Sequence, residues 1–238
     1  MAREVNLRRE TYSLGIHRMV ENEGSAIAQE FESLSPDALL RMSRRVDWRF
    51  LLPSPHLGDV AYIGVNGPMH LDSLRLFSNF LTNLDSIRTS EKNRREFDGI
   101  VLSEPSYEIL RRATNLVKSG GFIYLEVRKP LNPVELVKDL YSRMRKGFPR
   151  LIVPGDYLLL FEELGFTEVQ ANWHWPSFQA CTKIIPINNE SALDYAFLQS
   201  GRSTKARLKA ILGHWLQRSG LLWWVLPCFS VVAVRDGD

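Results

Sequence analysis

Three glycine-containing segments, in a fixed order along the chain, most constrain how this sequence can fold. Residues 58–68 (GDVAYIGVNGP) are typical of a strand and a glycine turn that opens a helix. Residues 97–105 (FDGIVLSEP) follow as a buried strand with an acidic end, and residues 117–127 (VKSGGFIYLEV) as a helix end, a Gly-Gly turn and a strand. Short apolar runs that alternate with longer helical ones predict an α/β protein with a largely parallel sheet.

This order of elements resembles the class I S-adenosylmethionine-dependent methyltransferases. The resemblance implies a Rossmann-like methyltransferase fold, whose sheet is mostly parallel with an antiparallel C-terminal edge. It also implies S-adenosylmethionine as cofactor, with the turn that contains Gly64, Asn66 and Gly67 around its methionine end and ribose. The family pattern has an acidic residue before the turn and three glycines, whereas here Tyr62 and Ile63 precede Gly64 and two glycines occur. A tight strand-to-helix connection without a ligand is the alternative interpretation of this turn.

The resemblance also implies an acidic residue at the end of the second strand. A carboxylate there takes the ribose hydroxyls, because it can accept two hydrogen bonds from a vicinal diol. Asp85, which stands 21 positions after Gly64, is the nearest candidate, and Asp72 is a poorer one. Asp85 stands in the sequence LDSI, which is more typical of a helix end than of a strand end.

The first and second segments are close together for the resembled fold. Gly64 and Asp98 are 34 positions apart. A complete fold places two helices and two strands between these landmarks, which needs roughly 50 residues or more. We therefore expect the sheet to lack one or two strands, including at least one of the two that normally lie here.

The hydrophobic pattern predicts the rest of the architecture. Residues 1–46 are expected to form an N-terminal helical segment, and residues 47–238 a methyltransferase-like α/β domain with an insertion at about 176–220. The strands are expected at 59–65, 99–102 and 122–127, adjacent in the sheet, with an edge strand at 167–173 and a last strand at 229–234. The helices are expected at 69–84, 106–118, 133–145 and 156–164.

Composition excludes several classes of protein. Hydrophobic residues make up 45% and charged residues 24% of the 238 residues, which are globular values. The net charge of +3 and the pI near 8.9 are too mild to predict nucleic-acid binding without a basic cluster. The two cysteines, Cys181 and Cys228, are far apart in sequence and predict neither a disulfide framework nor a zinc site. His17, His56, His70 and His214 have no spacing that indicates a metal site.

Apolar segments do not predict targeting to a membrane or for secretion. The N-terminus has charged residues but no apolar core of a signal peptide. The longest apolar run, residues 221–234, has 14 residues and contains Pro227, whereas a membrane span needs roughly 20. A buried strand is the expected structure of this run, and a cytoplasmic location is the expectation for the protein.

Polar residues at two strand ends are candidates for the substrate site. Ser103 and Glu104 end the second segment at the carboxyl edge of the predicted sheet, where open α/β sheets bind ligands. In the resembled family this position lines the methyl-acceptor site. Glu104 could orient or deprotonate an acceptor, or it could only cap the helix that begins near Ser106. Glu126, at the end of the next strand, has the same two interpretations.

The sequence Trp173-His174-Trp175 is the most distinctive local cluster. Two indoles beside the only ring that titrates near neutral pH would suit an acceptor pocket, with His174 as general base. The alternative is that these residues pack on the two sides of an edge strand and that His174 is exposed on the surface.

Residues 202–218 are expected to form a basic amphipathic helix. Leu208, Ile211, Leu212 and Trp215 fall on one face, with basic residues around it. Such a helix could lie on an anionic membrane as a peripheral contact or bind a protein partner. Most helices of this kind cover their own protein core, and that is the favoured interpretation here.

Three functions remain open at the level of the sequence. The first is transfer of a methyl group from S-adenosylmethionine to an oxygen or nitrogen of a small molecule. The second is a methyltransferase-like protein that has lost cofactor binding and acts as a partner subunit or binds another ligand. The third is an enzyme without cofactor that uses the cleft around Glu104 and His174.

Overall fold

The computed structural model of the chain describes residues 34–64, 68–84, 96–128, 154–198, 204–219, 221–222 and 226–237. The chain forms two compact units, Met1–Ser43 and Arg44–Asp238. In the described part of the first unit, helix α2 (Pro36–Arg45) begins after Ser35, whose hydroxyl accepts a hydrogen bond from the backbone N–H of Ala38. This side-chain contact caps the start of the helix.

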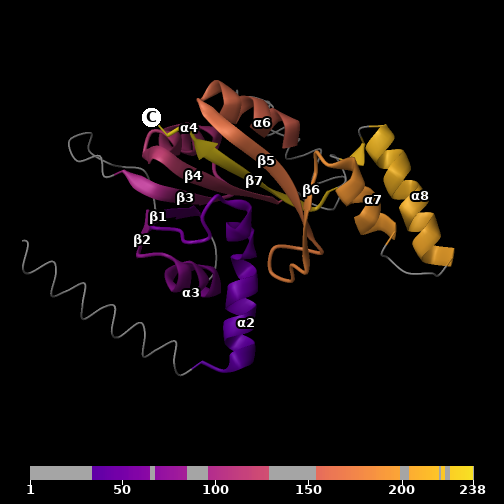
Figure 1. Cartoon of the computed structure of the whole chain (residues 1–238), viewed down its shortest axis with the longest axis horizontal. Coiled ribbons are helices and arrows are strands. Elements are labelled where there is room, and N and C mark those ends of the chain that lie inside the picture. Colours follow the sequence, from indigo (N-terminus) through magenta and orange to yellow (C-terminus); the bar gives the residue numbers. More distant parts are fainter. Residues whose placement is uncertain are drawn as a thin grey trace, which may run out of the picture. The chain divides into compact units, whose positions relative to one another are not determined.

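The described residues of the second unit build a seven-stranded sheet in the order β2-β1-β3-β4-β7-β5-β6 (Figure 1). The strands are β1 (Asp59–Gly64), β2 (Phe80–Asn83), β3 (Phe97–Ser103), β4 (Val117–Arg128), β5 (Phe166–Trp175), β6 (Lys183–Pro186) and β7 (Cys228–Arg235). The pairs β1–β2, β1–β3 and β3–β4 are parallel. β7 is antiparallel to β4 and β5, and β6 is antiparallel to β5. The predicted adjacency of β1, β3 and β4 and the antiparallel C-terminal edge are confirmed.

Helices cover both faces of this sheet. They are the 3-10 helix η1 (Asp47–Leu51), α3 (Pro68–Phe77), α4 (Tyr107–Thr114), α6 (Pro154–Glu163) and α7 (Glu190–Leu198). The last helix, α8 (Thr204–Arg218), packs on α7. Successive residues of a strand point to opposite faces. Ala61 and Ile63 therefore join a core with residues of α4 and α6, while Val60 and Tyr62 join a second core with residues of η1 and α3. The result is an α/β fold with apolar cores on both sides of the sheet.

The helix predicted over residues 69–84 was wrong in its second half. α3 ends at Phe77, and β2 follows as a strand parallel to β1. The backbone N–H of Asn79 donates to the carbonyl of Gly58, and that of Leu84 donates to the carbonyl of Tyr62. These bonds use the edge of β1, a distant partner that the local apolar spacing does not encode.

β5 was predicted as the edge strand, which is wrong because β6 pairs with its outer side. β6, α7 and α8 all come from the segment predicted as an insertion. The helix predicted at 133–145 lies outside the described residues. Residues 85–95 do too, so within the described part of the chain β2 is the one strand between α3 and β3.

Candidate functional site

A buried polar row crosses the sheet at the carboxyl ends of its parallel strands. Gly64, at the end of β1, lies beside Ser103 of β3, which lies beside Glu126 of β4. Beyond β4, Glu126 lies beside Ser230 of β7, which lies beside Asn172 of β5. Residues in register on neighbouring strands face the same side of a sheet, so these four side chains form one layer. The next row is apolar or aromatic, with Tyr62, Val101, Tyr124 and Val232.

Glu126, the centre of this row, is paired with Arg45. The distance from Arg45 Nη1 to Glu126 Oε1 is 2.6 Å and from Nη2 to Oε2 is 2.7 Å. The side chains are 5% and 0% exposed. Burial by itself raises the pKa of Glu126, but the Arg45 guanidinium outweighs burial and leaves this pKa below its usual value. Both residues are therefore charged at neutral pH. Glu126 was predicted as a substrate contact, but both of its carboxylate oxygens accept hydrogen bonds from Arg45.

Hydrogen bonds continue from Glu126 to a thiol on the far side of β7. The hydroxyl of Tyr124 donates to Glu126 Oε1 at 3.3 Å and is also hydrogen-bonded to Ser230. Ser230 Oγ lies 2.8 Å from Nε2 of His174. On the other side of the imidazole, Nδ1 lies 3.5 Å from Sγ of Cys181, a partly exposed residue. The result is a polar chain through the protein interior.

His174 is buried, so the alternative of an exposed histidine on an edge strand is wrong. Its side chain is 2% exposed, and burial lowers its pKa to about 4, which makes the imidazole neutral at pH 7. Both ring nitrogens have partners inside the protein. Trp173 and Trp175 contact each other with ring centroids 5.2 Å apart, on the face of β5 opposite to His174. The structure thus separates the imidazole from the two indoles, and base catalysis by His174 stays a prediction.

Glu104 lies at the carboxyl end of β3 with an unusual backbone. Its φ is 52°, which non-glycine residues seldom adopt, and its N–H donates to the carbonyl of Glu126 at 3.0 Å. The side chain is 54% exposed, with Oε1 3.5 Å from Nε of Arg128. The helix cap is Ser106, which accepts the N–H of Ile109, so the alternative role of Glu104 as a cap is not observed. Unusual backbone conformations cluster at functional sites, and Glu104 presents a carboxylate at this edge.

His70 is a candidate that the sequence did not single out beyond the search for metal ligands. It lies in the first turn of α3, is 4% exposed, and its ring is 5.4 Å from that of Tyr62. Neither ring nitrogen has a hydrogen-bond partner among the described residues. Burial, followed by the nearby positive charge of Arg45, lowers its pKa to about 4. No group of three His, Cys, Asp or Glu side chains in this part of the chain could hold a metal ion.

Phe178 is a second residue that the sequence did not indicate. It lies in the loop after β5 and yet is 1% exposed. Its ring is 4.7 Å from that of His174, 5.7 Å from the guanidinium of Arg45 and 6.0 Å from that of Arg128. The loop therefore folds back and covers the polar groups at the carboxyl ends of β4 and β5.

Three of the predicted cofactor contacts, Asn66, Gly67 and Asp85, lie outside the described residues. The fourth, Gly64, is required by the packing of the sheet itself. Its φ is +156°, and a Cβ atom there would lie 2.6 Å from Cβ and 2.8 Å from the carbonyl oxygen of Ser103. A side chain at this position would thus disturb β1 and β3 whether or not a ligand binds.

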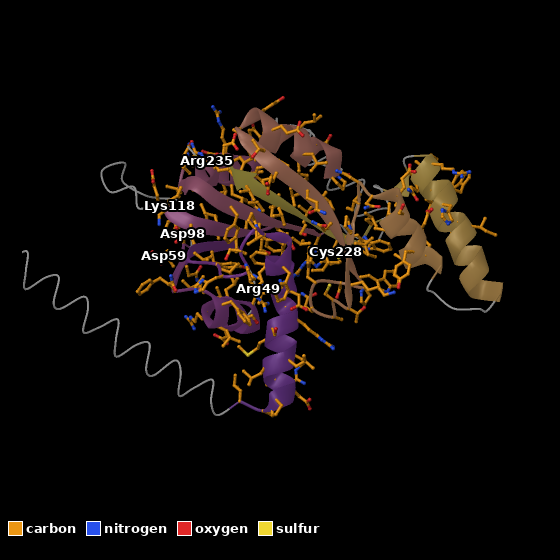
Figure 2. All side chains as sticks on the ribbon, in the orientation of Figure 1. Arg49, Asp59, Asp98, Lys118, Cys228 and Arg235 are labelled. Carbon is orange, nitrogen blue, oxygen red and sulfur yellow. The ribbon has the colours of Figure 1, made fainter. Side chains whose placement is uncertain are left out.

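Asp98 lies at the amino end of β3, at the other end of the parallel strands from Cys228, which pairs with Arg128 at the carboxyl end of β4 (Figure 2). Its Oδ2 accepts the N–H of Asp59 at 2.8 Å, and Oδ1 lies 2.7 Å from Nζ of Lys118. Burial alone would raise its pKa, but these donors outweigh burial and lower it. A pocket of about 240 Å³ adjoins it, lined by Leu52, His56, Gly58, Phe122 and Val234 among others. Asp98 thus connects strands at their amino ends, away from the predicted site.

The sheet topology defines an α/β protein with the mostly parallel sheet and antiparallel C-terminal edge that the sequence predicted. No model of a known protein family matches the sequence, and no curated protein matches it. Similar solved structures include a SAM-dependent methyltransferase from Thermotoga maritima, described as a possible histamine N-methyltransferase. It is 12% identical, with a TM-score of 0.42 over 84% of this chain and 89% of that chain.

Two further solved structures are similar at the same level. A SAM-dependent methyltransferase from Archaeoglobus fulgidus is 14% identical, with a TM-score of 0.44 over 82% of this chain and 94% of that one. Phosphoethanolamine N-methyltransferase 2 of Haemonchus contortus, in complex with S-adenosyl-L-methionine, is 13% identical with a TM-score of 0.42. The match covers 81% of this chain and 52% of the Haemonchus chain. The strand order and register described above carry the fold assignment.

Proposed function

We propose that this protein transfers a methyl group from S-adenosylmethionine to an oxygen or nitrogen atom of a small molecule. The observation that carries the proposal is the position of two candidate residues relative to β1 and β2. Gly64 is the last residue of β1, and Asp85 follows Asn83, the last residue of β2, by two positions. β2 and β3 lie on the two sides of β1, so the strand order reverses there. Open α/β sheets bind ligands at the carboxyl ends of the strands beside such a reversal.

The presence of β2 changes the interpretation of Asp85 as a candidate ribose contact. The sequence around Asp85 favoured a helix end, whereas β2 is a strand and ends at Asn83, two positions before Asp85 in the sequence. An acidic residue is expected there, because its carboxylate can accept hydrogen bonds from both hydroxyls of a ribose. Asp85 is therefore the ribose contact that we propose, with Asn66 and Gly67 beside the remainder of the cofactor.

His70 supports a polar ligand near the same strand end. It lies at the start of α3, the helix that follows the glycine turn, and both of its buried ring nitrogens lack partners among the described residues. An unsatisfied buried polar group costs about 1–3 kcal/mol, so such groups usually have a partner in the functional state. The cofactor, when bound, supplies an electrophilic methyl group. The proposed role of Gly64 and Asp85 is to hold it in line with the acceptor.

Glu104 is the base that we propose for the acceptor. Its exposed carboxylate could accept a proton from an acceptor hydroxyl or ammonium group, with Arg128 orienting it. His174 is the second candidate. To act as a base it would exchange its contact with Ser230 or Cys181 for a hydrogen bond to the acceptor. Ser103, Glu126, Trp173 and Trp175 were predicted as acceptor contacts, and Trp175 is the most exposed of them, at 46%. Glu126 would act indirectly, by holding the Arg45 side chain in place next to the acceptor.

A second function, a methyltransferase-like protein without cofactor, is favoured by the internal Arg45–Glu126 pair. A chain whose own guanidinium occupies the carboxyl end of β4 leaves less room for an acceptor. Phe178 covers the same groups. In that case the protein would act through a partner or another ligand.

Isothermal titration calorimetry with S-adenosylmethionine and S-adenosylhomocysteine separates the two functions. We expect the full chain to bind both. Asp85→Asn should weaken binding by about 10- to 100-fold, because hydrogen bonds to a charged group are worth about 1.5–3 kcal/mol. Asp72→Asn, at the poorer of the two candidates, should leave binding unchanged, because Asp72 lies on α3 and is paired with Arg75. Absence of binding to the unaltered protein at millimolar ligand would contradict methyl transfer and favour the second function.

A further inference from the structure

Helix α8 has an exposed apolar face. Ile211 is 66%, Leu212 53% and Trp215 58% exposed, although all three are large apolar residues. At 100° per residue they fall within one third of the helix circumference. The favoured expectation, that this face covers the core of the protein, is therefore wrong for these three residues. A contiguous exposed apolar patch indicates an interaction surface.

The opposite face of α8 packs on α7, which lies between β6 and α8 (Figure 1). Gly213 is buried there, and a Cβ atom on it would lie 2.8 Å from the ring of Phe197. His214 Nδ1 lies 2.9 Å from Oδ1 of Asp194, and Leu193 anchors α7 in the core on the α4 and α6 side of the sheet. α8 is thus attached through Gly213 and His214, and through Leu216, which packs against the same core, while Ile211, Leu212 and Trp215 are exposed.

Basic positions flank the apolar face of α8. Its 15 residues include four Lys or Arg and no Asp or Glu. With 100° between residues, the positions of Arg207 and Arg218 lie beside one border of the apolar face. The positions of Lys205 and Lys209 lie beside the other border. An apolar face with positive charge on both borders complements a surface that is apolar within and uniformly negative at its rim.

We propose that α8 lies in the plane of an anionic lipid bilayer and holds the protein at the membrane surface. Ile211, Leu212 and Trp215 would enter the boundary between headgroups and acyl chains, where tryptophan is favoured, and the basic positions would meet anionic headgroups. None of the described helices is long and apolar enough to cross a membrane. This inference does not depend on the proposed methyl transfer.

Sedimentation of the full chain with lipid vesicles tests the proposal. We expect binding to vesicles that contain phosphatidylserine, at least tenfold stronger than to pure phosphatidylcholine and weakened by added salt. Ile211→Ser combined with Trp215→Ser should reduce binding about tenfold or more, through lost apolar contact. Arg207→Gln combined with Arg218→Gln should reduce binding to anionic vesicles about fivefold per charge.

The controls use exposed residues on other helices. Leu159→Ser on α6, where Leu159 is 63% exposed, and Arg111→Gln on α4 should leave vesicle binding unchanged. Circular dichroism verifies that each variant is folded. No sedimentation with anionic vesicles, or equal binding by the Ile211 and Trp215 variant, would overturn the proposal. A dimer that this variant abolishes, without vesicle binding by the unaltered chain, would assign the face to a second copy and also overturn it.

Discussion

Arg45 and Glu126 lie 81 positions apart in the sequence and form two hydrogen bonds of 2.6 and 2.7 Å in the interior of the protein. This pair connects the residues just before η1 with the end of β4. Because Glu126 belongs to the polar row across the sheet, the pair fixes a charged group at the place where the parallel strands end.

Glu126→Gln is expected to lower the free energy of unfolding by about 3–5 kcal/mol, because Arg45 would stay buried without its partner charge. Urea denaturation measures this change. Glu108→Gln is the control, since Glu108 pairs with Arg112 at an exposed site, where such a pair contributes about 0–1 kcal/mol. A loss under 1 kcal/mol for Glu126→Gln would show that the pair is not a stabilising element. Arg45→Met together with Glu126→Leu should recover much of the loss, because no buried charge then remains.

Stability is expected to fall as the pH is lowered from about 6.5 to 4. His70 and His174 have pKa values of about 4 in the folded protein, against 6.5 in an unfolded chain. The unfolded chain thus binds protons first, so the contribution of each neutral imidazole is present above pH 6.5 and lost as the pH falls towards 4. Between pH 7 and 5 the loss is about 2 kcal/mol for each imidazole.

Urea denaturation at pH 7 and pH 5 measures this loss. The variant with His70→Gln and His174→Gln should have a smaller difference between the two pH values than the unaltered protein. An equal pH dependence of the two proteins would mean that neither imidazole is held neutral by burial.

Gly64→Ala is expected to destabilise the protein by about 1–3 kcal/mol in the absence of any ligand, because its Cβ would overlap Ser103. Gly155→Ala is the matched control, since no atom lies within 4 Å of a Cβ there, and it should change stability by less than about 0.5 kcal/mol. Thermal unfolding compares the two variants. If Gly64→Ala is as stable as the unaltered protein, β1 and β3 can separate enough to accept a side chain.

Glu104→Gln should lower the turnover of methyl transfer by about a hundredfold or more if Glu104 is the base, with little change in stability. His174→Ala should have a similar effect if His174 takes the proton instead. Formation of S-adenosylhomocysteine in the presence of candidate acceptors reports turnover, and Glu108→Gln serves as the control. Unchanged turnover in both variants would assign proton removal to another group or to water.

The centre of the sheet was predictable from sequence because its strands are short apolar runs bounded by glycines. β3 and β4 are buried on both faces, so neither strand needs a periodic pattern to be recognised. β2 was missed because Leu81 and Leu84 continue the helical spacing of α3, while the bonds that make it a strand go to β1. β6 was also missed, because the hydrogen bonds that make it a strand go to β5 and not to its neighbours in sequence.

The site was less predictable than the fold because strand positions indicate neither partners nor burial. The sequence placed Glu104 and Glu126 at strand ends with equal roles, whereas one is exposed and the other is bound to Arg45. His174 and its neighbouring tryptophans were grouped as one cluster, although residues next to each other on a strand face opposite sides. The burial of His70 depends on residues from several elements, which no local pattern contains.

The position of β7 has a consequence for the order in which the sheet can be completed. β2, β1, β3 and β4 form a connected set once Arg128 has been synthesised, but β5 and β6 reach this set only through β7. Residues 228–235 therefore join two parts of the sheet that are made much earlier. Until the ribosome has released this strand, the backbone groups along one edge of β4 and one edge of β5 stay unpaired. These two edges are then accessible to a chaperone.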